Sequence, residues 1–348
     1  MKCCPECFGD RGLRHNIFPL LAAEKGTCSF CTMENQALLN PKQLQDYFEL
    51  LVSAYRPDAN GKLLVHWFRN DWGLFMNPIM NDAKAKELLG EVLDDGDIVR
   101  KPFLPSEIVD KDRLSEWEKL REELMYRNRF FPDVELDEER LKNLFSHLSV
   151  TVGEVPDVWY RARIKTEDVP FPIEKMGAPD KRIAGHGRAN PAGIPYLYLG
   201  SNPKTAVSEI RPHTGEKACV ADFRTPAPPE LKLVDLREPR RTVSPFLLAE
   251  ALDIQKMRND LPFLERLGLE LTTPVLPQAA AVDYTPSQFL CEFIKQCGYD
   301  GVIYRSSVSD GINLALFYPE KAQPGSVIEY TVTSVTVAVA ETSAALRD

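Results

Sequence analysis

One segment of the chain brings together three side-chain types that suit the recognition of a nucleotide sugar. Within residues 185–210 the sequence contains, in this order, Arg188, Tyr196, Tyr198 and Glu209. A guanidinium is a planar set of donors that fits a phosphate, and an aromatic ring offers a flat face to nicotinamide or adenine. A carboxylate can bind ribose hydroxyls and stabilise the positive charge of an oxocarbenium-like transition state. This order therefore favours chemistry at a nucleotide–sugar bond over peptide hydrolysis.

Other catalytic motifs are missing from the sequence. It contains no G-x-S-x-G elbow of a serine hydrolase and no glycine-rich phosphate loop of the P-loop or dinucleotide type. The formal net charge of −9, from 42 basic and 51 acidic residues, argues against a protein that binds nucleic acid non-specifically. No run of about 18 apolar residues occurs, so we expect no membrane-spanning segment.

Four cysteines near the N-terminus are spaced as metal ligands. Cys4 and Cys7 form one CxxC pair, Cys28 and Cys31 form a second, and 20 residues separate the pairs. Four thiolates satisfy the tetrahedral preference of Zn²⁺, and a site closed by four protein ligands is structural rather than catalytic. Two disulfides, or thiols packed as small apolar groups, are the alternatives. Cysteines that bind a metal as thiolates are typical of the reducing cytosol, and the first residues lack the pattern of a signal peptide. We therefore expect a cytoplasmic location.

The sequence after the cysteine pairs has the pattern of α-helices. Apolar residues recur at helical spacing over residues 41–51, 82–94, 112–126 and 136–148. We therefore expect a zinc-binding segment over 1–35 and an α-helical domain over 36–150. Arg140 and His147 match the loose Arg-x4–6-His ribonuclease pattern of HEPN domains, a pairing that also arises often by chance.

The sequence pattern changes after residue 150, where short runs typical of β-strands alternate with a few helical segments. Strands are predicted over 158–164, 195–199, 218–223, 231–236, 301–304, 313–318 and 328–340. Helices are predicted over 203–211, 245–258 and 285–297. Strands mixed with few helices indicate an α+β domain built around a sheet, and we assign it residues 151–348.

Three blocks of this second region resemble the RES domain, a family named for an arginine, a glutamate and a serine. The blocks are VWYRARI (158–164), GRANPAGIPYLYLGSNPKTAVSEI (187–210) and GYDGVIYRSSVSDGINLALFYP (298–319), and they follow one another in family order. The resemblance covers about residues 150–320, and its specificity lies in the combination of the three blocks. It implies a mixed-sheet fold similar to that of ADP-ribosyltransferase toxins. Longer relatives carry a HEPN-like helical region in front, which fits residues 36–150.

The resemblance also implies the site residues. Those that match the family pattern are Arg161, Arg188, Tyr198, Glu209 and Ser306. Two assignments stay open, because Arg163 follows the first arginine on the same strand face and Ser307 doubles the serine. By this resemblance all five residues form the catalytic site, and Arg161, Arg188, Tyr198 and Ser306 are also assigned to NAD⁺ binding.

Each matched residue is expected to have a distinct task. Arg161 and Arg188 would hold phosphates, from NAD⁺ or from an attacking phosphate. Tyr198 would pack beside the nicotinamide, and Ser306 would orient the ribose or a phosphate. Glu209 would bind the ribose hydroxyls and favour the transition state.

The function implied by the resemblance is degradation of NAD⁺, which family members use as a co-substrate. The expected reaction is phosphorolysis to nicotinamide and ADP-ribose phosphate, by the toxin of a toxin–antitoxin or phage-defence system. A small helix-turn-helix antitoxin is the implied partner, and a homo-oligomer stays open. The alternatives are ADP-ribosyl transfer to a protein or nucleic acid, and a nucleotide-sensing or zinc-mediated binding module without turnover.

Overall fold

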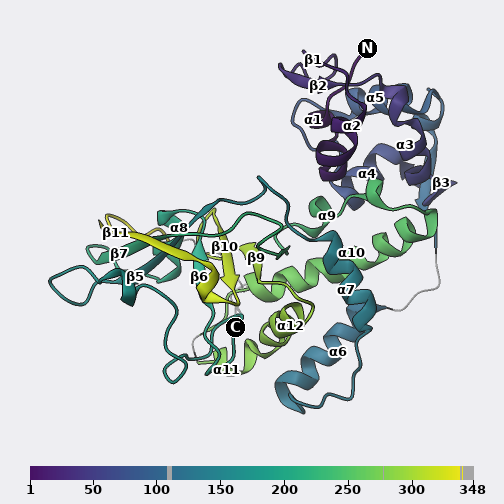
Figure 1. Cartoon of the computed structure of the whole chain (residues 1–348). Coiled ribbons are helices and arrows are strands. Elements are labelled where there is room, and N and C mark those ends of the chain that lie inside the picture. The colour runs from purple at the N-terminus through teal and green to yellow at the C-terminus, as the bar shows by residue number, and fades with distance from the viewer. Residues whose placement is uncertain (108–111, 277, 338, 340–348) are drawn as a thin grey trace, which may run out of the picture. The chain divides into compact units, whose positions relative to one another are not determined.

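The chain divides into two compact units in the computed structural model, which describes residues 1–107, 112–276, 278–337 and 339 (Figure 1). The N-terminal unit comprises Met1–Ser149, Val234–Leu271 and Pro277–Leu290. The sheet unit comprises Val150–Leu233, Thr272–Leu276 and Cys291–Asp348. Among the described residues, no helix is both long and apolar enough to cross a membrane.

The N-terminal unit consists mainly of helices. Its helices are α1 (Pro5–Phe8), α2 (Phe18–Leu21), α3 (Gln45–Val52), α4 (Leu64–Trp72), α5 (Asp82–Leu93), α6 (Arg113–Tyr126), α7 (Glu138–His147), α9 (Pro239–Thr242), α10 (Ala251–Thr272, of which Thr272 falls in the sheet unit) and α11 (Ala280–Asp283). Two small antiparallel ribbons accompany them, β1 (Glu24–Gly26) with β2 (Gln36–Leu38) and β3 (Tyr55–Leu63) with β4 (Pro102–Pro105). Helix α12 (Thr285–Gln296) has residues in both units.

The helices predicted from apolar spacing are present with small shifts at their ends. Those predicted over 82–94, 112–126 and 136–148 are α5, α6 and α7. Each begins after a side chain that accepts a backbone N–H, namely Asn81, Asp112 and Asp137. Helix α3 starts later than predicted because Pro41–Leu44 forms a single tight 3₁₀ turn in front of it. Helix α4 and the β3–β4 ribbon were not predicted.

A buried carboxylate joins α10 to the helices before it. Asp260 of α10 is 1% exposed and binds Arg113 of α6 at 2.8 Å and Arg140 of α7 at 2.7 Å. The Arg140 guanidinium is thus committed to an ion pair within the unit. This structural role accounts for the arginine of the HEPN-type Arg140–His147 pair.

Helix α10 is longer than the sequence pattern predicted. The expected segment ended at residue 258, whereas α10 continues through Pro262 to Thr272. Proline normally ends a helix because it lacks an N–H donor. Here the buried side chains of Leu261, Phe263 and Leu264 anchor the turns on both sides of it. The structure groups most of α10 with residues 1–149. The sequence had favoured a single domain over 151–348, and these domain boundaries stay a prediction.

The sheet unit confirms the predicted α+β class. Seven strands lie in the order β11-β7-β5-β6-β10-β9-β8, and the pairings from β11 to β9 are antiparallel. Figure 1 labels these strands except β8. The strands are β5 (Val158–Ile164), β6 (Leu197–Gly200), β7 (Lys217–Arg224), β8 (Leu233–Asp235, of which Val234 and Asp235 fall in the N-terminal unit), β9 (Gly301–Arg305), β10 (Ile312–Leu316) and β11 (Gln323–Thr331). Helix α8 (Pro203–Glu209) follows β6 directly.

The two faces of this sheet have different partners. One face carries the main apolar core, with Trp159, Leu199 and Leu314 among its buried members. On the other face Ala162 and Val220 pack against Ala206 of α8. Two of the predicted site residues lie in strands, and alternation places Arg161 on the Trp159 face and Tyr198 on the face that packs against α8.

The last strand lies earlier in the chain than predicted. The sequence favoured a strand over 328–340, but β11 spans Gln323–Thr331, and residues 332–337 form no strand. Residues 338 and 340 lie outside the described residues. Thr331 pairs with Lys217, the first residue of β7, so β11 ends where its partner begins. Val332 still exchanges backbone hydrogen bonds with Gly215 and Glu216 in the turn before β7, whereas residues 333–337 pair with no strand among the described residues.

Replacing Asp260 by alanine should destabilise the N-terminal unit by about 3–5 kcal/mol, because two largely buried guanidinium groups lose their shared carboxylate. Glu139→Ala is the matched control, since it removes the exposed partner of Lys142 and should cost less than about 1 kcal/mol. Chemical denaturation of the full chain measures both. Equal, small losses for the two variants would contradict the structural role of Asp260.

Candidate active site

Glu209 is held in place by the side chains of two residues that follow it by about 100 positions in the sequence. It is the last residue of α8, a helix that begins at Asn202-Pro203, where the Asn202 side chain accepts the Thr205 N–H. Its Oε1 accepts hydrogen bonds from Ser306 Oγ at 2.7 Å and from Asn313 Nδ2 at 2.6 Å. The structure therefore brings together two of the five predicted site residues, and Ser306 rather than Ser307 supplies the contact.

Ser306 sits at the start of a tight turn that follows β9. Its backbone N–H donates to the Gly311 carbonyl at 3.0 Å. Its hydroxyl oxygen accepts the backbone N–H groups of Val308 at 3.2 Å and Ser309 at 3.1 Å. The turn is thus organised around the same hydroxyl that donates to Glu209.

Asn313 was not recognised from the sequence. It lies on β10, is 4% exposed, and pairs across the sheet with Gly200 on one side and Tyr304 on the other. Its Oδ1 is buried without a hydrogen-bond partner among the described residues. The sequence could have pointed to it, because an asparagine inside the apolar run INLALF is expected to be buried and therefore to need a hydrogen-bond partner.

Tyr304 is a second residue that the sequence reading missed. It is 5% exposed and shares a sheet face with Asn313 and Tyr198, through the register that pairs β9, β10 and β6. Burial raises its pKa well above the usual value, the nearby Tyr198 hydroxyl and Glu209 carboxylate add to this effect, and the Arg188 charge acts in the opposite direction. Tyr304 therefore stays a neutral phenol among groups predicted to form the site.

Tyr198 fixes the turn that carries Arg188. Its hydroxyl donates to Asn190 Oδ1 at 2.7 Å and accepts the Ala189 N–H at 2.9 Å. A Cβ at Gly187 would lie 2.5 Å from the Tyr198 hydroxyl oxygen, so this close approach requires glycine. Arg188 itself donates from Nη1 to the Thr273 carbonyl at 2.5 Å. The tyrosine thus positions the arginine turn in addition to any contact with a ligand.

Arg161 lies apart from the Glu209 cluster. Strand alternation places it on the Trp159 face of the sheet, and its Nη1 reaches the Tyr198 carbonyl at 3.2 Å. Burial, reinforced by the nearby Arg163 charge, lowers its pKa to about 10, so the group is cationic at neutral pH. Its Nε is buried without a partner among the described residues.

Arg163 has different contacts from those of Arg161. Its Nη1 donates to the Lys175 carbonyl at 2.5 Å, and its guanidinium lies 4.8 Å from the centre of the Phe171 ring. Arg163 therefore ties β5 to the loop before β6. Arg161, by contrast, contacts the backbone of the Tyr198 strand, and both arginines lie on the sheet face opposite the Tyr198 side chain.

Tyr196 belongs to the core rather than to the site. It is 1% exposed, its ring lies 4.8 Å from that of Phe317, and Lys295 Nζ lies 5.2 Å from its centre. Of the two close tyrosines of this segment, only Tyr198 contacts another predicted site residue.

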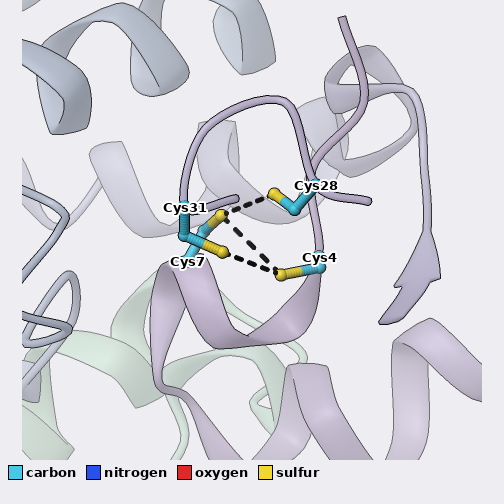
Figure 2. A group of neighbouring side chains, drawn as sticks. All are labelled: Cys4, Cys7, Cys28 and Cys31. Atoms are coloured by element: carbon cyan, nitrogen blue, oxygen red, sulfur yellow. Dashed lines mark hydrogen bonds between the residues drawn. The ribbon is translucent and has the colours of Figure 1, made fainter. Parts of the chain in front are cut away.

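The four N-terminal cysteines converge in the N-terminal unit, far along the chain from these residues. Figure 2 shows their sulfur atoms facing one another, and all four lie within 4.8 Å of each other and are buried. The sulfur–sulfur distances are 3.9 Å for Cys4–Cys7 and 3.3 Å for both Cys4–Cys31 and Cys7–Cys28. A disulfide would need about 2.05 Å. Four sulfurs about 2.3 Å from one Zn²⁺ would be about 3.8 Å apart, so the cluster fits a tetrahedral ion after small adjustments.

Electrostatics agree with a cation-binding role for this cluster. Hydrogen bonding to the Cys28 sulfur raises the pKa of Cys4 and Cys7, and the reciprocal contacts lower the pKa of Cys28. Four thiolates this close together would repel one another. A divalent ion would supply the missing positive charge.

The family to which the chain belongs follows from its second half. The sequence model of the RES domain matches residues 158–333, just over half of the chain, and the chain is therefore a member of the RES-domain family. A solved structure that the chain resembles is a chain of the MbcT–MbcA toxin–antitoxin complex from M. tuberculosis, with 13% identity and a TM-score of 0.33. That similarity covers 56% of this chain and 93% of the other. The search of curated proteins found no match.

Replacing Tyr198 by phenylalanine should loosen the Arg188 turn, because two hydrogen bonds to Ala189 and Asn190 are lost. We expect a loss of about 1–3 kcal/mol in stability and faster exchange of the Ala189 amide hydrogen. Tyr160→Phe on the adjacent strand is the control and should change neither quantity appreciably. Unchanged exchange at Ala189 in the Tyr198 variant would show that the hydroxyl does not hold the turn.

Proposed function

We propose that this protein is an enzyme that cleaves NAD⁺ between nicotinamide and ribose by phosphorolysis, giving nicotinamide and ADP-ribose phosphate. Membership of the RES-domain family supports an enzyme that acts on NAD⁺ in general. The observation that carries the specific proposal is the Glu209 carboxylate, held by Ser306 and Asn313 through one oxygen only. Its Oε2 has no hydrogen-bond partner among the described residues and is available to a ribose.

The carboxylate suits the electronic demand of this reaction. When the bond from ribose C1 to the nicotinamide nitrogen breaks, its electron pair leaves with neutral nicotinamide and positive charge develops on the sugar. A fixed anion beside the sugar stabilises that charge without reorganising at the moment of reaction. A phosphate oxygen then bonds to C1, which completes the transfer. In this proposal Glu209 binds the ribose hydroxyls and favours the transition state.

The arginines supply the complementary charge. Arg188 and Arg161 would bind the pyrophosphate of NAD⁺ or the attacking phosphate, since guanidinium donors match phosphate oxygens. The buried Nε of Arg161, without a partner among the described residues, would gain one from such an oxygen. Tyr198 would pack beside the nicotinamide with its ring while its hydroxyl serves the Arg188 turn.

The biological setting follows from the same proposal. An enzyme that drains NAD⁺ stops metabolism, so the chain would act as the toxin of a toxin–antitoxin pair or a phage-defence system, restrained by a helix-turn-helix antitoxin. ADP-ribosyl transfer to a macromolecule uses the same bond cleavage with another acceptor. Mass spectrometry of the products formed from NAD⁺, with and without inorganic phosphate, distinguishes these reactions. ADP-ribose phosphate formed only with phosphate supports phosphorolysis.

We also propose that Cys4, Cys7, Cys28 and Cys31 bind one structural Zn²⁺. Support comes from their CxxC spacing, their burial and the mutual distances of their sulfur atoms. Four protein ligands leave no position for a substrate, so this ion would stabilise the N-terminal unit rather than take part in cleavage.

Zinc analysis tests this second proposal. Freshly purified protein should contain about one equivalent of zinc, and Cys28→Ser should lose it and unfold the N-terminal unit more easily. Cys297→Ser, outside the cluster, is the control and should keep the metal. Less than about half an equivalent in the parent protein would contradict the zinc site.

Replacing Glu209 by glutamine tests the main proposal, because glutamine keeps the shape but removes the charge. The rate of NAD⁺ cleavage should fall by about 10²–10³, the usual effect of losing one preorganised electrostatic partner. Binding of NAD⁺ should weaken much less, since the arginines hold the phosphates. Glu230→Gln, at an exposed glutamate of the same unit, should retain the parent rate. A folded Glu209→Gln variant that cleaves NAD⁺ at the parent rate would overturn the proposal.

A further inference from the structure

We infer that Ser306 and Asn313 are positioning residues that act on the substrate only through Glu209. The inference rests on the proposed function, and it replaces the expectation that Ser306 orients the ribose or a phosphate directly. It also adds Asn313, a residue outside the five predicted from the family pattern, to the machinery of the site.

The first step is the hydrogen-bonding capacity of Ser306. A serine hydroxyl offers one donor and two acceptor positions. The donor goes to Glu209 Oε1 at 2.7 Å, and the acceptors take the N–H groups of Val308 at 3.2 Å and Ser309 at 3.1 Å. All three positions are therefore used within the protein. A contact with ribose or phosphate would have to break one of them.

The second step is the convergence of both donors on one carboxylate oxygen. Asn313 Nδ2 donates to the same Oε1 at 2.6 Å, from a strand residue that is 4% exposed. The amide is fixed by its strand, and the hydroxyl is fixed by its turn. Together they saturate Oε1 and leave Oε2 without a partner among the described residues, so the carboxylate presents a single defined oxygen to a ligand.

The third step is that Glu209 needs these two hydrogen bonds to hold its side chain in one conformation. Glu209 is exposed and ends a helix of seven residues, and Arg211 just beyond adopts a left-handed backbone with φ of 48°. A glutamate at a helix end has several accessible rotamers. Catalysis by a fixed charge requires one of them, and neighbouring donors supply that restraint.

A double-mutant cycle separates action through Glu209 from direct action on the substrate. Ser306→Ala and Asn313→Ala are each made in the parent and in the Glu209→Gln protein, and NAD⁺ cleavage is followed in single turnovers. In the parent, each should lower kcat by about 10–100-fold, as is typical for partners that orient a catalytic group, with KM for NAD⁺ changed less than threefold. In the Glu209→Gln protein, each should cost less than about threefold, because the group they orient is already lost. Ser306→Thr, which keeps the hydroxyl, should restore most of the rate.

The possible failures are distinct from one another. Equal losses in both backgrounds, or a rise in KM as large as the fall in kcat, would overturn the inference and return Ser306 to direct substrate contact. A parent rate for Glu209→Gln would instead overturn the proposed function. Circular dichroism and chemical denaturation check that each variant is folded. Should Asn313→Ala unfold, the cycle with Ser306→Ala, at a half-exposed turn residue, decides the matter alone.

Discussion

The hydrogen bonds to Glu209 depend on one close approach between a helix and a strand. Ser306 and Asn313 are 97 and 104 residues from Glu209 in sequence, and they reach it only because α8 lies against β6 next to β10. A Cβ at Gly200 would lie 2.8 Å from the Ala206 nitrogen, so a larger residue would push the helix away. The register that pairs Gly200 with Asn313 then places the amide beside the end of α8.

Strand β6 joins both halves of the candidate site. Gly200 at its end admits α8 and hence Glu209, while Tyr198 two residues earlier holds the turn with Arg188 through its hydroxyl. Arg161 contacts the backbone of the same strand. Because one strand carries all three connections, the Arg188 turn and the Glu209 carboxylate keep a fixed arrangement, while Arg161 lies on the other face of the sheet.

Much of this could be predicted from the sequence, and the exceptions share a cause. The bounds of β5 follow from local pattern, and the quoted blocks named Glu209 and Ser306 as residues of one site, although their direct contact was not predicted. Asn313 and Tyr304 lie in apolar strand runs and looked like core residues, because their importance comes from register and not from local sequence. The extension of α10 beyond residue 258 is likewise fixed by packing, through buried Leu261, Phe263 and Leu264 and the ion pairs of Asp260, and β11 ends where its partner strand β7 begins. Each of these features depends on contacts between residues that are distant in the sequence.

In the proposed complex, the positive side chains of the site would face the negative part of NAD⁺, and the negative side chain would face its positive part. The dinucleotide has an anionic pyrophosphate and a cationic nicotinamide, and the candidate site offers arginines and one carboxylate. Tyr304 lies among these groups, and its raised pKa keeps it neutral, so it adds no negative charge beside Glu209. In the proposed reaction, Glu209 is the anion beside the sugar, whose positive charge grows as the bond breaks. Since Oε1 is saturated by neutral donors rather than by an arginine, the carboxylate is oriented without being neutralised, and its charge stays available for that step.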